Sequence, residues 1–262
     1  MISNCWYLTT LICLFSYQIS NCFGIYCNGH KMIQSGGLTC ADRQLILDEH
    51  NKLRQSLALG KVNGQPRASN MREMVWDDNL AALAQSWADQ CTIAHDYSRN
   101  DGRFPVGQNL AATWTTRSSI SPIPDFRRQI NDWFNEVSLF HYGSTGFTVA
   151  TGHYSQLAWG ETYLVGCGYS FYYDKSRGYT KLYICNYGPG GNVVGEEPYV
   201  QGPPSCPLYG MSSSSRYQGL CGVQGYSNLG SACSNSISQG FNTDTSNSKF
   251  QYNSAFKFYY GR

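Results

Sequence analysis

The residues best suited to chemistry lie in the second half of the chain, where His153 stands two positions before Ser155. Alternate residues of a β-strand share a face, so on a strand this imidazole and this hydroxyl could meet. A hydrolase of this type also needs an oriented base and a nucleophile on a sharp turn. The chain has no G-x-S-x-G sequence and no evident acidic third member. The pair therefore does not by itself indicate an enzyme.

The first 24 residues have the features of a secretory signal. The stretch 6–15 is mostly apolar but too short to span a bilayer, and cleavage after Gly24 follows the small-residue rule. We therefore predict a signal peptide over residues 1–24, a secreted extracellular protein and no transmembrane segment.

The cysteines support an oxidising, extracellular setting. Of 11 cysteines, three (Cys5, Cys13 and Cys22) lie in the predicted signal. The remaining even number indicates four disulfides, and none of these cysteines has the C-x-x-C spacing typical of zinc sites. The eight that remain are Cys27, Cys40, Cys91, Cys167, Cys185, Cys206, Cys221 and Cys233.

The overall charge excludes two classes of partner. The formal net charge is +2 and only 14% of residues are charged, which argues against a nucleic-acid binder or a polybasic membrane binder. The hydrophobic fraction of 42% can support a packed core.

Helical periodicity predicts three helices that must position any site. One covers about residues 41–59, and a second starts after Trp76 with Asp77 or Asp78 as its cap. A third begins near Asp125 and has a broad apolar face.

Strands follow the helices. The segments 164–173 and 179–187 flank a turn at 174–178, which predicts a hairpin in which Cys167 and Cys185 could be bonded across the strands. Helices followed by strands favour an α+β fold.

The two ends of the predicted domain are less regular. We expect residues 25–38 to be irregular, with Gly36 as a breaker, and a domain that spans residues 25–200. Residues 201–262 are predicted to form a hinge and a loop-rich extension rich in Ser, Gly, Asn and Tyr, stapled by its cysteines.

Four motifs occur in an order that resembles one family. They are His50-Asn51-x-x-Arg54, Gly107-Gln108-Asn109-Leu110, GHYSQLAW at 152–159 and LYICNYGPGGNV at 182–193. Together they resemble the CAP superfamily, which comprises cysteine-rich secretory proteins, antigen 5 and plant pathogenesis-related proteins. The resemblance covers about residues 40–199, and the stretch 49–91 looks most like venom allergen-like members of invertebrates.

The resemblance implies a three-layer α-β-α sandwich with a central antiparallel sheet. It also implies the disulfides Cys40–Cys91 and Cys167–Cys185, and it makes Cys206–Cys221 a candidate pair. One cysteine of the extension would then pair outside it, with Cys27 as the candidate partner.

The family's central cleft holds two histidines and two acidic residues, and the matching positions here are His95, Gln108, Glu136 and His153. Two imidazoles and a carboxylate could bind Zn²⁺ with one position open. Gln108 replaces the second acidic residue, which removes a charge, a general base and a good metal ligand. Zinc is thus a candidate cofactor, although none is required. The alternative is that His153 and Glu136 are hydrogen-bonded structural groups.

The other histidines carry a weaker signal. His50 is interpreted as a structural residue of the first-helix motif, and His30 and His141 as solvated loop residues.

Two features that resemble family ligand sites favour lipid binding. The helices around 45–57 and 126–140 could leave an apolar channel, similar to the fatty-acid site of some antigen 5 relatives. Phe140, Tyr142 and Phe147 resemble an aromatic loop tied to sterol binding in fungal and parasite members. The alternative for both is core packing with an exposed aromatic loop.

The sequence therefore predicts a secreted, non-enzymatic CAP-domain protein that binds a fatty acid, a sterol or an extracellular protein partner. One alternative is a metal-dependent hydrolase that uses His95, Glu136 and His153. The other is a protein-recognition module, such as a venom allergen or immune modulator, with no small ligand.

Overall fold

The structure is a computed structural model, and it describes residues 26–144 and 146–223. The predicted signal peptide, Cys233 and most of the predicted extension lie outside the described residues.

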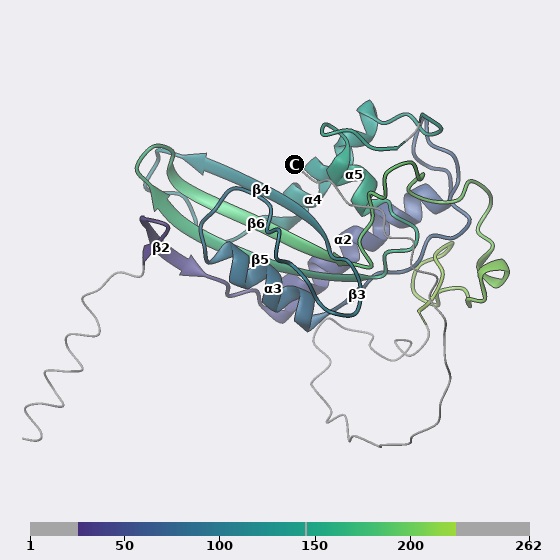
Figure 1. The fold of residues 1–262 in the computed structure, drawn as a ribbon, viewed down its shortest axis with the longest axis horizontal. Helices are drawn as coiled ribbons and strands as arrows, with labels where there is room; N and C mark the ends of the chain where they lie inside the picture. Colours follow the sequence, from purple (N-terminus) through teal and green to yellow (C-terminus); the bar gives the residue numbers. More distant parts are fainter. Residues whose placement is uncertain (1–25, 145, 224–262) are drawn as a thin grey trace, which may run out of the picture.

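A twisted sheet forms the centre of the molecule, with strand order β1-β2-β5-β6-β4 (Figure 1). All pairings along this path are antiparallel, and β3 pairs with β5 in parallel. The strands are β1 (Tyr26–Cys27), β2 (His30–Ser35), β3 (Val75–Trp76), β4 (Gly107–Thr115), β5 (Leu164–Asp174) and β6 (Gly178–Gly188).

Helices cover both faces of this sheet. They are α2 (Cys40–Ala58), α3 (Asp78–Ala88), α4 (Phe126–Asn135) and α5 (Gly152–Leu157), with short 3₁₀ helices η1 (Glu136–Leu139) and η2 (Cys206–Tyr209). In the part of the chain that the structure describes, no helix combines the length and the apolar character that crossing a bilayer requires.

The layers follow from the alternation of side chains along β5 and β6. Val165, Tyr169 and Tyr183 are buried in one core with residues of α2, α4 and α5. Their neighbours Leu182 and Ile184 point the other way and pack in a second core with residues of α3. Because the sheet lies between two helical layers, the predicted α-β-α sandwich is confirmed.

Helix α3 lies unusually close to the sheet. A Cβ atom at Gly166 would come within 2.2 Å of the backbone of Ala81, and one at Gly168 within 2.4 Å of Gln85. Only glycine therefore permits this approach.

The predicted helices are confirmed, together with their caps. The side chain of Asp77 accepts from the N–H of Leu80 at the start of α3, and Asp125 accepts from the N–H of Arg128 at the start of α4. These caps satisfy backbone donors that would otherwise be unpaired.

The predicted hairpin is confirmed as β5 and β6. Cys167 lies directly opposite Cys185 in the register, and the two form a disulfide with a Cα–Cα distance of 4.1 Å.

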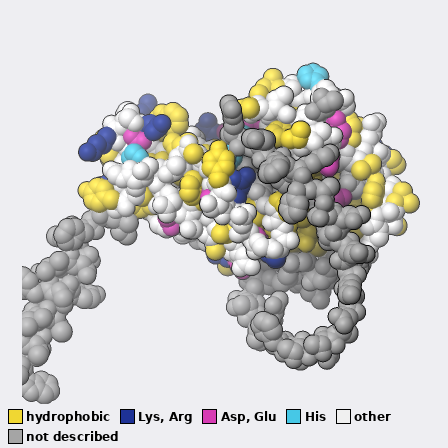
Figure 2. All heavy atoms as spheres, viewed as in Figure 1, with side chains coloured by type: hydrophobic (Ala, Val, Ile, Leu, Met, Phe, Trp, Pro, Cys, Tyr) yellow, Lys and Arg dark blue, Asp and Glu magenta, His cyan; other side chains and the backbone are white. Residues whose placement is uncertain are grey.

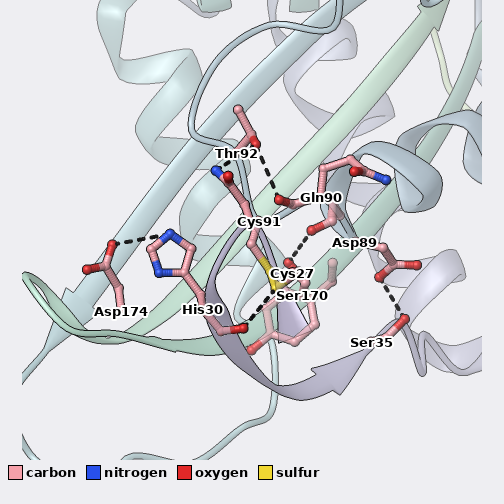
Figure 3. Close-up of a disulfide and its surroundings, with 12 residues drawn as sticks. Cys27, His30, Ser35, Asp89, Gln90, Cys91, Thr92, Ser170 and Asp174 are labelled. Carbon is pink, nitrogen blue, oxygen red and sulfur yellow. Dashed lines mark hydrogen bonds and ion pairs between the residues drawn. A yellow bond between two sulfur atoms is a disulfide. The ribbon is translucent and has the colours of Figure 1, made fainter. Parts of the chain in front are cut away.

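The expectation of irregular structure over residues 25–38 is wrong. Asn28 and Gly29 adopt positive φ angles of 48° and 77° and turn β1 back onto β2, which then pairs with β5. His30 is consequently a half-buried strand residue 3.9 Å from Asp174, and not a solvated loop residue (Figure 3).

The implied Cys40–Cys91 disulfide is also wrong, because Cys91 is bonded to Cys27 (Figure 3). The expected pairing of Cys27 with a cysteine of the extension is wrong for the same reason. The β1–β2 hairpin places Cys27 beside the end of α3, with Cα atoms 5.6 Å apart. Cys40 begins α2, whose core lies on the opposite face of the sheet. Cys40 is disulfide-bonded as well, whereas the other six described cysteines pair among themselves.

The described part of the predicted extension packs against the domain. Cys206 and Cys221 form the predicted disulfide, and Leu220 has no exposed surface in the main core. The N–H of Cys221 donates to the carbonyl of Met71 at 2.8 Å. The boundary at residue 200 stays a prediction, since the chain remains in contact with the domain as far as Cys221.

Charge is distributed unevenly over the surface. Basic side chains gather at the end of the sheet that carries the β5–β6 turn, at the left of Figure 2, where Lys31, Lys175 and Arg177 lie. Asp174 at this turn is bonded to Arg177 at 2.9 Å.

Candidate functional site

His50 of the first-helix motif has a structural role. His50 has no exposed surface, and its Nδ1 lies 2.8 Å from the carbonyl oxygen of Ile46, so Nδ1 must donate. Its Nε2 therefore accepts from the hydroxyl of Tyr187 at 3.0 Å. Burial lowers the pKa of His50 to about 4. The ring is neutral at physiological pH and both nitrogens are engaged, so it cannot bind a ligand.

Arg54 of α2 joins two other segments of the chain, the loop before β3 and the connection from α5 to β5. Its guanidinium has no exposed surface and donates to five backbone carbonyls, those of Arg72, Leu157, Trp159, Gly160 and Thr162, at 2.7–3.4 Å. No carboxylate pairs with it in the part of the chain that the structure describes. The carbonyl oxygens supply the compensation that a buried cation requires.

A cavity of about 800 Å³ lies where β4 begins. Its walls come from the loop before β4, the loop before α5 and the turn after β6. Three of the four predicted tetrad residues line it, namely His95, Gln108 and His153. Glu136 does not line the cavity itself, but its carboxylate is bonded to the ring of His153, which does.

His95 is held by Gln108. The Oε1 atom of Gln108 accepts from the N–H of Asp96 at 3.1 Å, so the same oxygen, 2.9 Å from His95 Nδ1, must also accept there. The amide nitrogen of Gln108 donates to Asn186 at 3.0 Å, which fixes its orientation. Burial is the main cause that lowers the pKa of His95, and the nearby Arg99 and His153 lower it further. The proton on Nδ1 leaves Nε2 as the free ring nitrogen.

His153 is held by Glu136 in the same way. Oε1 of Glu136 lies 2.7 Å from His153 Nδ1, and Oε2 accepts from the N–H groups of His153 and Tyr154 at 3.0 and 3.1 Å. The residue before α5, Thr151, makes no capping bond with its side chain. Glu136 therefore caps α5 from outside the helix, and both of its oxygens are occupied.

The cavity wall is cationic. Among the described residues that line it there is no Asp or Glu, and Arg99 supplies a positive charge, whereas burial lowers the pKa of His95 and so favours its neutral ring. Arg99 is anchored by donation from Nε to the carbonyl of Val106 at 2.9 Å and from Nη1 to the carbonyl of Asp96. A cleft that is lined by charge of one sign favours an ion of the opposite sign.

The donor set does not suit a three-ligand zinc site. Zinc in catalytic sites takes three protein ligands, but Glu136 and the Oε1 of Gln108 are already used to orient the imidazoles. No group of three His, Cys, Asp or Glu residues placed to hold a metal occurs within the described ranges. Two Nε2 atoms beside Arg99 would offer at most a weak site for a cation.

The expected proximity of His153 and Ser155 on a strand is wrong, because both lie on the short helix α5. Ser155 is 1% exposed, and its hydroxyl lies 2.6 Å from the side-chain oxygen of Asn192 and 3.0 Å from the carbonyl of Thr151. The serine is bonded to oxygen atoms and not to an imidazole, so no base activates it.

The three aromatic residues of the predicted lipid loop have different surroundings. Phe140 is buried with its ring 5.1 Å from that of Tyr154, and the hydroxyl of Tyr142 donates to the carbonyl of Tyr199 at 2.6 Å. Only Phe147 lines the cavity. The apolar faces of α2 and α4 pack in a single core, and a role for the loop or for this interface in lipid binding stays a prediction.

Sequence reasoning missed Arg99 and Val149 in the cavity wall. Neither belongs to one of the four motifs, so no local signal pointed to them. Asn192 and the preceding glycines do lie in the second long motif, and they line the cavity beside the start of β4.

Comparison with known proteins decides the family. A profile of the cysteine-rich secretory protein family, CAP, matches residues 47–187. The chain belongs to the CAP family. Salivary antigen-5 of Dipetalogaster maximus is 36% identical over 200 residues, which cover 74% of this chain and 80% of the relative. Venom allergen 5 of Polistes dominula is 42% identical over 191 residues, which cover 69% and 79%.

Solved structures agree with this CAP assignment. BmVAL-1 is 28% identical with a TM-score of 0.59, and the match covers 76% of this chain and all of that one. NaASP2, solved with Zn²⁺, is 27% identical with a TM-score of 0.56, and the match covers 72% and 98%. The predicted superfamily and its venom allergen-like branch are thereby confirmed.

Proposed function

We propose that this CAP protein is secreted and non-enzymatic, and that its cavity binds a ligand that combines an anionic group with an apolar body. One observation carries the proposal: the cavity is lined by the guanidinium of Arg99 and by two imidazoles, and by no acidic residue among those described. Secretion is supported by the relatives, which include a salivary antigen and venom allergens.

The cavity has two chemically different parts. Arg99 can donate to an anion, and the Nε2 atoms of His95 and His153 can donate as well when a bound anion draws a second proton onto the ring. Hydrogen bonds to charged groups contribute about 1.5–3 kcal/mol each. Phe147 supplies an apolar surface, and Val149, which is 84% exposed, adds to it at the rim. Burial of such surface by a ligand contributes about 25 cal/mol per Å². A long-chain fatty acid satisfies both parts, whereas a sterol satisfies only the apolar one.

The hydrogen bonds support binding over catalysis. Hydrolysis by a serine requires a base within hydrogen-bond reach, and Ser155 is bonded to Asn192 and Thr151 instead. The carboxylate of Glu136 is fully occupied by His153 and the start of α5, so it cannot act as a general base without releasing them.

A metal-dependent hydrolase is the second candidate, favoured by the two oriented imidazoles. An imidazole with Nδ1 held by an acceptor is typical of metal-binding histidines. NaASP2 was solved with Zn²⁺. In this chain, however, Gln108 replaces an acidic residue and Arg99 lines the same wall, and both changes weaken cation binding.

The test is calorimetric titration with hexadecanoate and with its uncharged methyl ester. We expect the acid to bind at least about tenfold more tightly, since one charge-assisted hydrogen bond is worth about that factor. Arg99→Met should remove this preference, and Arg117→Met, a matched change of an exposed residue on the loop after β4, should leave it intact. Equal affinity for acid and ester would refute the proposal.

A further inference from the structure

The strand β4 forms an open edge of the sheet, at the top of the sheet in Figure 1. It pairs with β6 over nine consecutive residues without a register shift, and within the described chain its backbone has no partner on the other side. Alternate N–H and C=O groups of an antiparallel edge strand point away from its neighbour. β4 therefore presents a row of unpaired backbone groups.

Nothing in the sequence of β4 protects this edge. Natural edge strands are usually short, bulged, or guarded by Lys or Pro. The sequence from Gly107 to Thr115, GQNLAATWT, has no charged residue and no proline. Trp114 is 55% exposed, and the small side chains of Ala111 and Ala112 are half-buried. An unguarded edge of this length is a template for pairing with another chain.

The cationic cavity lies across the same edge. Gln108 holds His95 on the α3 face of the sheet, where its amide reaches Asn186. Asn109 donates to the carbonyl of His153 on the opposite face. Both histidines and the residues Gly107–Asn109 line one cavity. A chain that pairs with the first residues of β4 would therefore have its end in this cavity.

We propose that β4 accepts the C-terminal segment of a partner polypeptide as an added antiparallel strand, with its terminal carboxylate in the cavity. This inference rests on the proposed function, because the carboxylate uses the anion site of Arg99, His95 and His153. A strand antiparallel to β4 ends beside Gly107, so its C-terminus, and not its amino terminus, meets the cationic groups. Proteins recognise peptides both by strand addition, in which main-chain hydrogen bonds give the affinity, and by capture of a C-terminal carboxylate.

The geometry sets the length and composition of the segment. At about 3.4 Å per residue, a peptide of about seven residues spans β4 from Trp114 to the cavity. Its side chains alternate between the two faces, so β-branched and aromatic residues suit it best.

The test uses a fluorescein-labelled peptide, Lys-Thr-Val-Thr-Tyr-Thr-Val. Its binding to the full mature chain is measured by fluorescence anisotropy. The free acid should bind at least about tenfold more tightly than the C-terminal amide, as expected for a lost charge-assisted bond. Arg99→Met should abolish this difference, and Arg117→Met should preserve it. Equal binding of acid and amide would overturn the inference.

Strand pairing is tested separately by N-methylation of alternate residues in two complementary peptides. Only one set of peptide N–H groups can face β4, so one peptide should lose at least about tenfold in affinity and the other should retain it. Equal effects of the two sets would contradict the pairing. If hexadecanoate binds while no peptide does, this inference fails and the proposed function stands. If neither binds, both fail.

Discussion

Two histidine environments in this molecule differ in one respect that decides their roles. At His50 both ring nitrogens are bonded to protein atoms and the side chain has no exposed surface. At His95 and His153 only Nδ1 has a bonding partner among the described residues, and both side chains line a cavity. All three belong to family motifs or matched positions, so the motif does not separate structure from binding. The count of satisfied ring nitrogens does.

Removal of the Arg54 guanidinium should have the largest effect. Arg54→Met leaves five backbone carbonyls without their donor in a region closed to water. We expect a loss of more than about 4 kcal/mol in the free energy of unfolding, because breaking a buried polar network is among the costliest changes. Urea denaturation measures this loss. The matched change Arg117→Met should cost less than about 0.5 kcal/mol, and a similar cost for both variants would contradict the structural role.

Acid should destabilise the protein through His50. The folded pKa, about 4, lies below the usual 6.5, so the unfolded chain takes up the proton first as the pH falls. The part of the free energy of unfolding that depends on a neutral His50 is complete above pH 6.5. It is lost between pH 6.5 and pH 4, by about 3 kcal/mol in total.

Urea denaturation at pH 7 and at pH 4.5 measures the contribution of His50. His50→Gln should flatten the pH dependence, and His141→Gln, at an exposed site, should not. A wild-type profile in the His50 variant would show that the ring does not titrate as its burial implies.

The substitution Glu136→Gln should have an intermediate effect. An amide offers one acceptor oxygen to three donors, the Nδ1–H of His153 and the N–H groups of His153 and Tyr154. We expect a loss of about 1–2 kcal/mol from unsatisfied donors and the lost cap, together with weaker anion binding as His153 turns. Thermal unfolding and hexadecanoate titration report the two effects. Glu161→Gln, on the surface, is the control, and equal behaviour of the two variants would remove the capping role.

Metal removal should have the smallest effect. Since the cavity presents cations and no third ligand, a chelator should change the affinity for hexadecanoate by less than about twofold. Added Zn²⁺ should not strengthen binding. Loss of binding in chelator, with recovery on zinc, would instead establish a metal as the anchor of the ligand.

Local signals predicted the parts of the fold that depend on neighbouring residues. Asp77 and Asp125 mark helix starts, and the turn at 174–178 marks the hairpin. The β1–β2 hairpin escaped prediction although Asn28-Gly29 is a turn signal, because the half-exposed strand HKMIQS has few apolar residues. The Cys27–Cys91 pairing depends on that hairpin, so it escaped too.

The candidate site could be predicted only in part. The resemblance supplied His95, Gln108, Glu136 and His153, and the structure brings them together in two hydrogen-bonded pairs around one cavity. It did not reveal that Glu136 caps α5, because the cap and the helix lie on separate elements. The charge of the cavity escaped prediction as well, since it depends on Arg99, which only the folded loop places there.

Nitrogen NMR of the imidazoles tests the central claim most directly. In ¹⁵N-histidine-labelled protein, assigned through single His→Gln variants, hexadecanoate is titrated at pH 7. The account predicts saturable shifts of the Nε2 resonances of His95 and His153, with both Nδ1 atoms protonated throughout and the resonances of His50 unchanged. Unmoved Nε2 resonances of His95 and His153 at saturating ligand would contradict it.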